Sequence, residues 1–169
     1  TGDFEYLVGS GGEKVIKQMI SLTHPQNYNE LLKLIGGLAH GTCTWRHNAE
    51  HLLADGVCSL ADIPATRDEV FMSIRDAMHD CDFQDMGFAF DIANKARRGY
   101  YREHGMDDYT NSTLQMIGLD SWFGSYIRFT QYMSTKALAV LELKYSIILN
   151  WYRTYYPREY QQIMADYST

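Results

Sequence analysis

The stretch Thr66–Asp107, TRDEVFMSIRDAMHDCDFQDMGFAFDIANKARRGYYREHGMD, decides the fold class of this chain. Thr66 is a candidate N-cap, and Glu69 three residues later completes a capping box at the start of a helix. Apolar residues then recur at the spacing of one helix face in two runs: Val70, Ile74, Ala77 and Met78, followed by Phe88, Ala89, Ile92, Ala93 and Ala96. A short polar segment separates the runs, so the stretch predicts two antiparallel helices packed as an αα-hairpin.

The remainder of the chain carries the same helical periodicity. Almost no segment alternates apolar and polar residues with the period of a strand, so we expect an all-α protein with about seven or eight helices. We expect a single domain over residues 12–169, preceded by an irregular, glycine-rich arm over residues 1–11. Gly36 and Gly37 interrupt one predicted helix and weaken it by roughly 1 kcal/mol each, unless a neighbouring helix packs closely against them.

Composition narrows the partners and the compartment. The formal net charge of −6 argues against a nucleic-acid partner, because such proteins usually present a basic face. Three cysteines without framework spacing predict buried thiols in a reducing compartment. The chain begins at Thr1 without Met, so we expect an upstream segment to have been removed. The longest apolar run, residues 137–152, contains Glu142 and Lys144 and predicts no membrane insertion.

Two consecutive segments, residues 27–65 and 66–106, are both helix–turn–helix units, and superposing them pairs Ile35 with Ile74. Such self-similarity predicts antiparallel hairpins stacked into an α-solenoid, because one hairpin cannot bury both of its faces alone. The second unit, EVFMSIRDAMHDCDFQDMGFAFDIANKARRGYYREHGMDD, has a helix, a short polar turn, a second helix and a glycine-then-acidic exit. In these features it resembles a pentatricopeptide-type repeat.

That resemblance implies a pentatricopeptide-like superhelix. Many proteins of this type bind organellar RNA, and an organellar RNA-binding repeat protein is one alternative. An acidic chain with few units is more similar to members that make protein contacts. Its size, acidity and missing Met resemble the small accessory-subunit family of the mitochondrial ATP synthase in euglenozoan protists. This second resemblance implies a non-enzymatic, mitochondrial subunit that docks on the catalytic head, with no cofactor and no small-molecule substrate.

The C-terminal third is rich in aromatic residues that have one polar end. The chain holds 13 tyrosines and three tryptophans, and such side chains are enriched where a protein meets another protein. A tyrosine-lined groove inside the fold explains the enrichment equally well. The sequence predicts a protein interface formed by Trp122, Tyr126, Tyr132, Trp151, Tyr152, Tyr155, Tyr156 and Tyr160.

The strongest enzymatic alternative is a metal-dependent phosphohydrolase of the HD type. His47, the His79-Asp80 pair and the distant Asp120 would hold one or two hard cations that activate water. Asp80 also fits a turn, where aspartate bonds the local backbone. A weaker alternative is a di-iron site formed by two triads at helical spacing. The triads are His47, Glu50 and His51, and Asp76, His79 and Asp80. The simpler explanation is that both triads are solvated helix faces.

A stripe of cations follows the second helix of the central hairpin. Lys95, Arg98 and Arg102 fall on one face and could contact phosphate groups. Cations near the C-terminus of a helix also complement its dipole, and that explanation needs no ligand.

Overall fold

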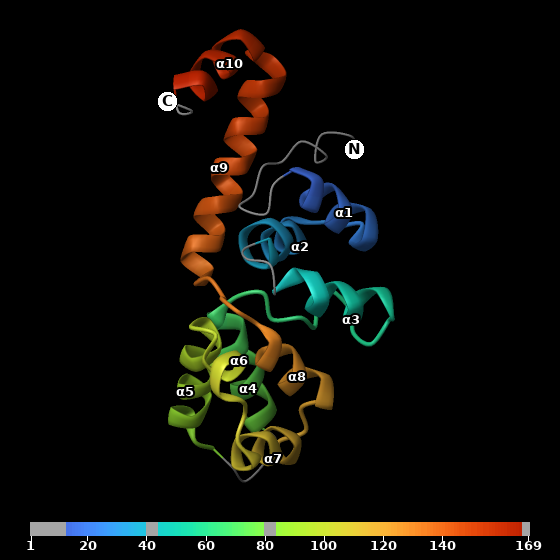
Figure 1. Cartoon of the computed structure of the whole chain (residues 1–169), viewed down its shortest axis with the longest axis vertical. Coiled ribbons are helices and arrows are strands. Elements are labelled where there is room, and N and C mark those ends of the chain that lie inside the picture. Colours follow the sequence, from blue (N-terminus) through green and yellow to red (C-terminus); the bar gives the residue numbers. More distant parts are fainter. Residues whose placement is uncertain (1–12, 40–43, 80–83, 167–169) are drawn as a thin grey trace.

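The computed structural model describes residues 13–39, 44–79 and 84–166, and these residues form an all-helical structure (Figure 1). The described part contains ten α-helices, two π-helical segments and no strand, which confirms the all-α class. The predicted irregular arm over residues 1–11 lies outside the described residues. No helix in the described part combines the length and hydropathy needed to cross a membrane.

The helices follow one another in short segments until the last third of the chain. In order they are α1 (Glu13–Thr23), α2 (Tyr28–Leu31), η2 (Leu32–Leu38), η3 (Trp45–Ala49), α3 (Glu50–Ala54), α4 (Arg67–His79), α5 (Met86–Arg97), α6 (Tyr100–His104), α7 (Asp108–Met116), α8 (Ser121–Phe129), α9 (Lys136–Tyr155) and α10 (Pro157–Asp166). The π-helical segment η2 continues directly from α2, and η3 continues directly into α3.

The predicted central hairpin is present as α4 packed against α5. The backbone amide of Glu69 donates to Oγ1 of Thr66 at 3.3 Å, so Thr66 caps α4 as the sequence predicts. The Glu69 carboxylate in turn accepts from the amide of Ala65 at 2.8 Å. Asp85 caps α5 through a bond from the Phe88 amide to its carboxylate at 3.2 Å. Local capping chemistry therefore fixes where both helices begin.

Two adjacent glycines allow the backbone of η2 to approach its neighbours closely. A Cβ added to Gly36 would overlap the carbonyl group of Ala139 in α9. A Cβ added to Gly37 would lie 2.6 Å from the Cβ of Ala65. The close packing that the sequence required for these glycines is therefore present, and it brings α9 onto η2.

The segment Tyr126–Ser134, which we call the junction, ends α8 and leads into α9. The Tyr126 hydroxyl donates to the carbonyl oxygen of Pro64 at 2.8 Å, and the Ser134 hydroxyl donates to that of Gly36 at 3.2 Å. The amide of Arg67 at the start of α4 donates to the Ser134 carbonyl oxygen at 2.9 Å. The junction thus joins the N-terminal helices to the central hairpin.

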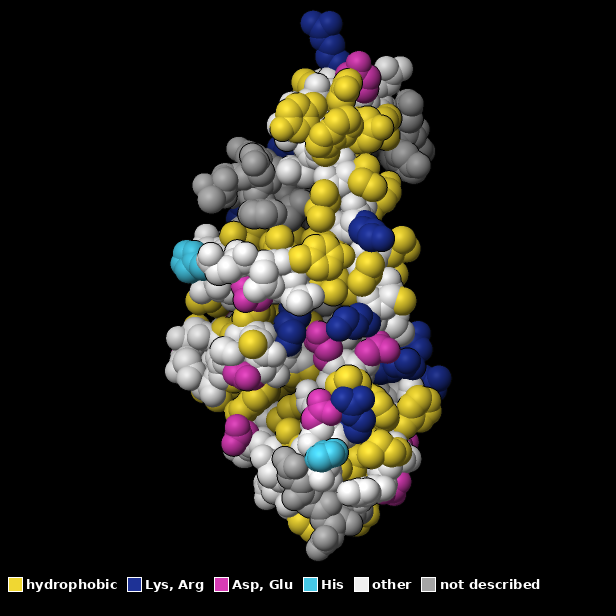
Figure 2. Space-filling view, turned by 180° about the vertical axis from the view of Figure 1, so that it is seen from behind, with side chains coloured by type: hydrophobic (Ala, Val, Ile, Leu, Met, Phe, Trp, Pro, Cys, Tyr) yellow, Lys and Arg dark blue, Asp and Glu magenta, His cyan; other side chains and the backbone are white. Residues whose placement is uncertain are grey.

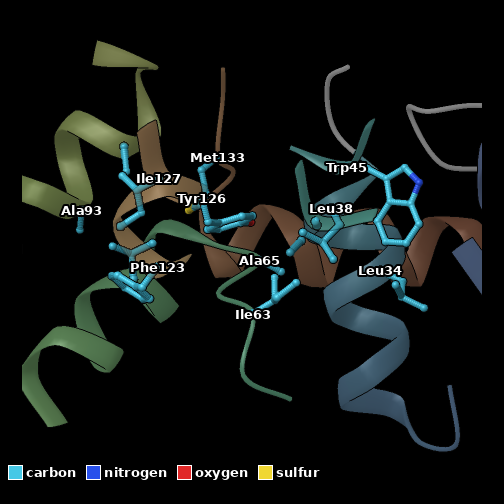
Figure 3. Close-up of a cluster of buried hydrophobic side chains, with 14 of the residues drawn as sticks. Leu34, Leu38, Trp45, Ile63, Ala65, Ala93, Phe123, Tyr126, Ile127 and Met133 are labelled. Atoms are coloured by element: carbon cyan, nitrogen blue, oxygen red, sulfur yellow. The ribbon is translucent and has the colours of Figure 1, made fainter. Parts of the chain in front are cut away.

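The same region forms the centre of the apolar core. Tyr126 and Ala65 lie in the middle of Figure 3, between Phe123 and Ile127 on one side and Leu38 on the other. Tyr126 is only 1% exposed and Ala65 is fully buried. Because one set of buried side chains runs through both groups of helices, they share a single core.

The helix contacts do not follow the order expected of a solenoid. In a stack of hairpins, each unit contacts mainly its neighbours in sequence. Here α9 packs against η2 and α8 packs against η3, although large parts of the chain separate each pair. The structure confirms a helical fold without showing a stack of repeats.

We predict that Gly36→Ala destabilises the protein by about 1–3 kcal/mol, since the added methyl group would overlap the Ala139 backbone and neither helix could relax freely. The free energy of unfolding from urea titrations measures the effect. Ser125→Ala, at an exposed position of α8, is the control and should change it by no more than about 0.5 kcal/mol. Equal stability of the two variants would show that α9 does not press on η2.

Candidate site formed by three arginines

Three arginines and a histidine line one cavity of about 410 Å³ on the surface of the helical body. They come from three separate elements: Arg46 and His47 from η3, Arg102 from α6, and Arg128 from the end of α8. Tyr101, Gly105 and Phe129 complete the lining. The lining therefore combines two aromatic residues with three arginines and a histidine.

A break in the helical backbone places Arg46 and His47 at the surface. Arg46 has an extended backbone (φ −63°, ψ 135°) and His47 a left-handed one (φ 60°, ψ 17°). A positive φ is unfavourable for a residue with a Cβ, and such strain often marks functional positions. Trp45 and Asn48 on either side are buried, so they hold the break in place while the side chains of Arg46 and His47 remain exposed.

Hydrogen bonds to the junction hold this broken segment. The Asn48 side-chain amide donates to the carbonyl oxygen of Tyr126 at 2.9 Å and to Oγ1 of Thr130 at 3.3 Å. The Thr44 hydroxyl donates to the Tyr132 carbonyl oxygen at 2.7 Å. Because Tyr126 and Arg128 belong to the same helix, these bonds fix Arg46 relative to Arg128.

The third arginine is positioned by a tight turn between α5 and α6. Gly99 has φ 66°, and a Cβ at this position would overlap the carbonyl oxygen of Gln131 in the junction. The amide of Met133 donates to the Arg97 carbonyl oxygen at 3.3 Å across the same contact. Only glycine fits this turn, which brings α6 and its Arg102 onto the junction.

Within the described residues, no carboxylate neutralises the positive charge of the cavity. None of the described lining residues is acidic. None of the three guanidinium groups forms an ion pair or hydrogen bond with any part of the chain that the structure describes, and that of Arg128 instead lies 5.0 Å from the centre of the Phe129 ring. Burial raises the pKa of Tyr101 far above its ordinary value, so the phenol stays neutral. Guanidinium groups left unpaired around a cavity suit an anion with several oxygens, such as phosphate.

The candidate metal ligands do not meet. His47 lines the arginine cavity, His79 lines a second cavity with Arg75 and Asp76, and Asp120 lines a third with Cys58. Asp80 lies outside the described residues. Within the described ranges no group of three or more histidine, cysteine or acidic side chains could hold a metal ion. The spacing along the sequence suggested a site that the fold separates.

The predicted stripe of cations is also divided. Lys95 pairs with Asp91 at 2.6 Å on α5, while Arg102 belongs to a different helix and faces the cavity. Sequence analysis missed Arg46 and Arg128 because no local pattern connects them to Arg102. The signal available was weak: a cation beside an aromatic residue, as in Trp45-Arg46 and Arg128-Phe129.

The residues predicted to form a protein interface fall into two groups. Tyr126 is buried in the core, which removes it from any surface, and Trp122 is half-buried. The exposed group consists of Tyr132, Trp151, Tyr152, Tyr155 and Tyr156, and Tyr160 is intermediate. All but Tyr132 of these lie on α9 and α10 or between them. The interface prediction stays open for this C-terminal group.

Comparison with known proteins finds relatives of this chain among DNA polymerases. No protein-family model matches it. The chain is 30% identical over 146 residues to the PolC-type DNA polymerase III of Oceanobacillus iheyensis, a match that covers 86% of this chain and 10% of the relative. The polymerase of Clostridium perfringens is 28% identical over 151 residues, covering 88% and 10%. That of Listeria monocytogenes is 26% identical over 148 residues, covering 86% and 9%.

The chain therefore spans about a tenth of the length of these curated relatives, and it is similar to a region of PolC-type DNA polymerase III. This finding corrects the interpretation drawn from the repeat. The match runs across both repeat units and most of the chain, so the pentatricopeptide resemblance was wrong. The assignment as an accessory subunit of mitochondrial ATP synthase was wrong for the same reason. The alternative assignments, as an HD-type phosphohydrolase and as an organellar RNA-binding repeat protein, were wrong as well.

We predict that Asn48→Ala destabilises the protein by about 1–3 kcal/mol, because the junction would lose two buried bonds that fix η3. Urea titrations measure the loss. Asn29→Ala, at an exposed position of α2, is the control. A change below about 0.5 kcal/mol in the Asn48 variant would show that η3 is held by other contacts.

Proposed function

We propose that the chain is a helical part of a PolC-type DNA polymerase and that its arginine cavity binds a phosphate group. The distant similarity to such polymerases over most of the chain supports the first statement. The cavity lined by Arg46, Arg102 and Arg128 carries the second. DNA synthesis presents phosphate in two forms, the backbone of the primer–template duplex and the triphosphate of the incoming nucleotide.

The contribution of the cavity is binding, not bond breaking. A guanidinium group keeps its proton at every pH at which a protein is folded, so it cannot act as a general base. It can donate two parallel hydrogen bonds to phosphate oxygens, and three such groups on a fixed frame would orient the ligand as well as attract it. The Phe129 ring makes a cation–π contact with Arg128, which helps to hold that guanidinium group beside the cavity.

The overall acidity of the chain is compatible with this role. Net charge governs long-range repulsion, whereas a ligand at the surface responds to the local field. Among the described residues no acidic side chain lines the cavity, so the acidity of the described part is concentrated outside it. This proposal replaces the expectation, drawn from the net charge, that nucleic acid is not a partner.

We predict that Arg46→Ala, Arg102→Ala and Arg128→Ala each weaken the binding of a labelled primer–template duplex and lower the slope of log K against log salt by about one. Fluorescence anisotropy between about 50 and 200 mM salt measures both quantities. Arg158→Ala is the matched control, because it removes the same charge from an exposed position on α10.

Competition identifies the form of phosphate. If a deoxynucleoside triphosphate displaces the duplex and depends on the same three arginines, the cavity holds the nucleotide. If only unlabelled duplex competes, it holds the DNA backbone. A triple arginine variant that binds both ligands as tightly as the unmodified chain would overturn the proposal.

A further inference from the structure

The C-terminal helices α9 and α10 expose a second notable surface, which is apolar. Only Ala139, Leu143 and Ser146 of α9 are buried, and all three lie in the first eleven residues of this 20-residue helix. Beyond them α9 extends past the helical body and carries α10 at its tip (Figure 1). We call the exposed apolar side chains of this part the arm surface: Tyr145, Ile147, Ile148, Trp151, Tyr152, Tyr155, Tyr156, Ile163 and Met164.

The arm surface is concentrated. Figure 2 shows hydrophobic side chains gathered over the α9–α10 end of the molecule. Trp151 is 46% exposed and Tyr155 is 66% exposed. A contiguous apolar surface of this kind is rare on a protein that works alone and marks a site of contact.

We infer that the arm surface docks against an apolar, weakly charged protein surface in the remainder of a PolC-type polymerase chain. This inference rests on the proposed function for its partner. The similar polymerases carry about nine-tenths of their length outside the matched region, so each contains a large protein body to which such a surface can attach.

The charge of the arm surface favours protein over nucleic acid. Between Tyr145 and Met164 the sequence contains three charged residues, Arg153, Arg158 and Glu159, which sum to a net charge of +1. Binding a nucleic-acid backbone requires several cations along its path, and two arginines beside a glutamate do not provide them. A weakly charged, aromatic-rich surface is instead typical of the core of a protein interface.

The arrangement of the aromatic rings on the arm surface also favours a protein partner over nucleic acid. Trp151 and Tyr152 meet edge to face, with ring centres 5.1 Å apart and planes at 83°. Tyr156 lies 5.1 Å from Trp151 at 45°. These rings pack on one another as a cluster, whereas a surface that stacks bases presents separate, accessible ring faces. The cluster is therefore a preformed anchor for a neighbouring protein surface.

Hydroxyl-radical footprinting with mass spectrometry tests the inference at single residues. The isolated chain is compared with a chimera in which it replaces the matched region of the Oceanobacillus iheyensis polymerase. We expect labelling of Trp151 and Tyr155 to fall at least about fivefold in the chimera, as for side chains buried in an interface core. Tyr109, 66% exposed on α7, is the internal control and should stay labelled. Unchanged labelling of Trp151 and Tyr155, or loss at Tyr109 to the same degree, would overturn the inference.

A second measurement needs only the isolated chain. The double variant Trp151→Glu, Tyr155→Glu should lose only the ring contacts of the exposed cluster, so its Tm should fall by no more than about 5 °C. A larger fall would mean that the arm surface already packs against the helical body of this chain. Sedimentation velocity should show a monomer. A dimer that the double variant abolishes would assign the surface to a second copy, and either result would overturn the inference.

The experiments distinguish a failure of the phosphate-site proposal from a failure of the docking proposal. Protected Trp151 with DNA binding that ignores the three arginines would remove the phosphate site and keep the docking surface. Arginine-dependent DNA binding with Trp151 exposed in the chimera would keep the phosphate site and remove the docking surface.

Discussion

The hydrogen bonds of the junction, Tyr126–Ser134, are the constraint on which the rest of the structure depends. This short segment receives bonds from or donates bonds to Gly36 in η2, Asn48 in η3, and Pro64 and Arg67 at the entry to α4, which are three different parts of the chain. Buried polar groups must be paired, so the segment accepts few other arrangements. The same bonds that hold the helices together also set the positions of the arginines around the cavity.

Sequence reasoning succeeded where the signal was local. Thr66 caps the helix that follows it as predicted, because capping depends on side chains a few residues away. The paired glycines required close packing on η2, and Ala139 and Ala65 provide it. Sequence reasoning failed where contacts join distant segments. The residues around Gly36 do not indicate that α9 is the helix that packs there. Helical periodicity predicts that a face is buried and does not identify the element that covers it.

The candidate site was beyond sequence reasoning for the same reason. Arg46, Arg102 and Arg128 are brought together by the Gly99 turn and by the bonds of Asn48. Composition pointed away from them, because a net charge averages over a surface whose acidic and basic groups are unevenly placed. The pattern of His47, His79 and Asp120 misled in the other direction. It matched a known metal-binding motif in sequence, but in the fold the three residues line three separate cavities.

The arginine cavity and the arm surface leave different kinds of interaction unsatisfied. The cavity leaves positive charge unpaired, and salt weakens attraction of that kind. The arm surface leaves apolar area in contact with water, and its association is nearly independent of salt. Because α9 carries the arm surface away from the junction that frames the cavity (Figure 1), one can be engaged without covering the other. Under the two proposals above, a segment anchored through its arm by hydrophobic contact would release and rebind phosphate at its cavity, as repeated contact with a moving DNA substrate requires.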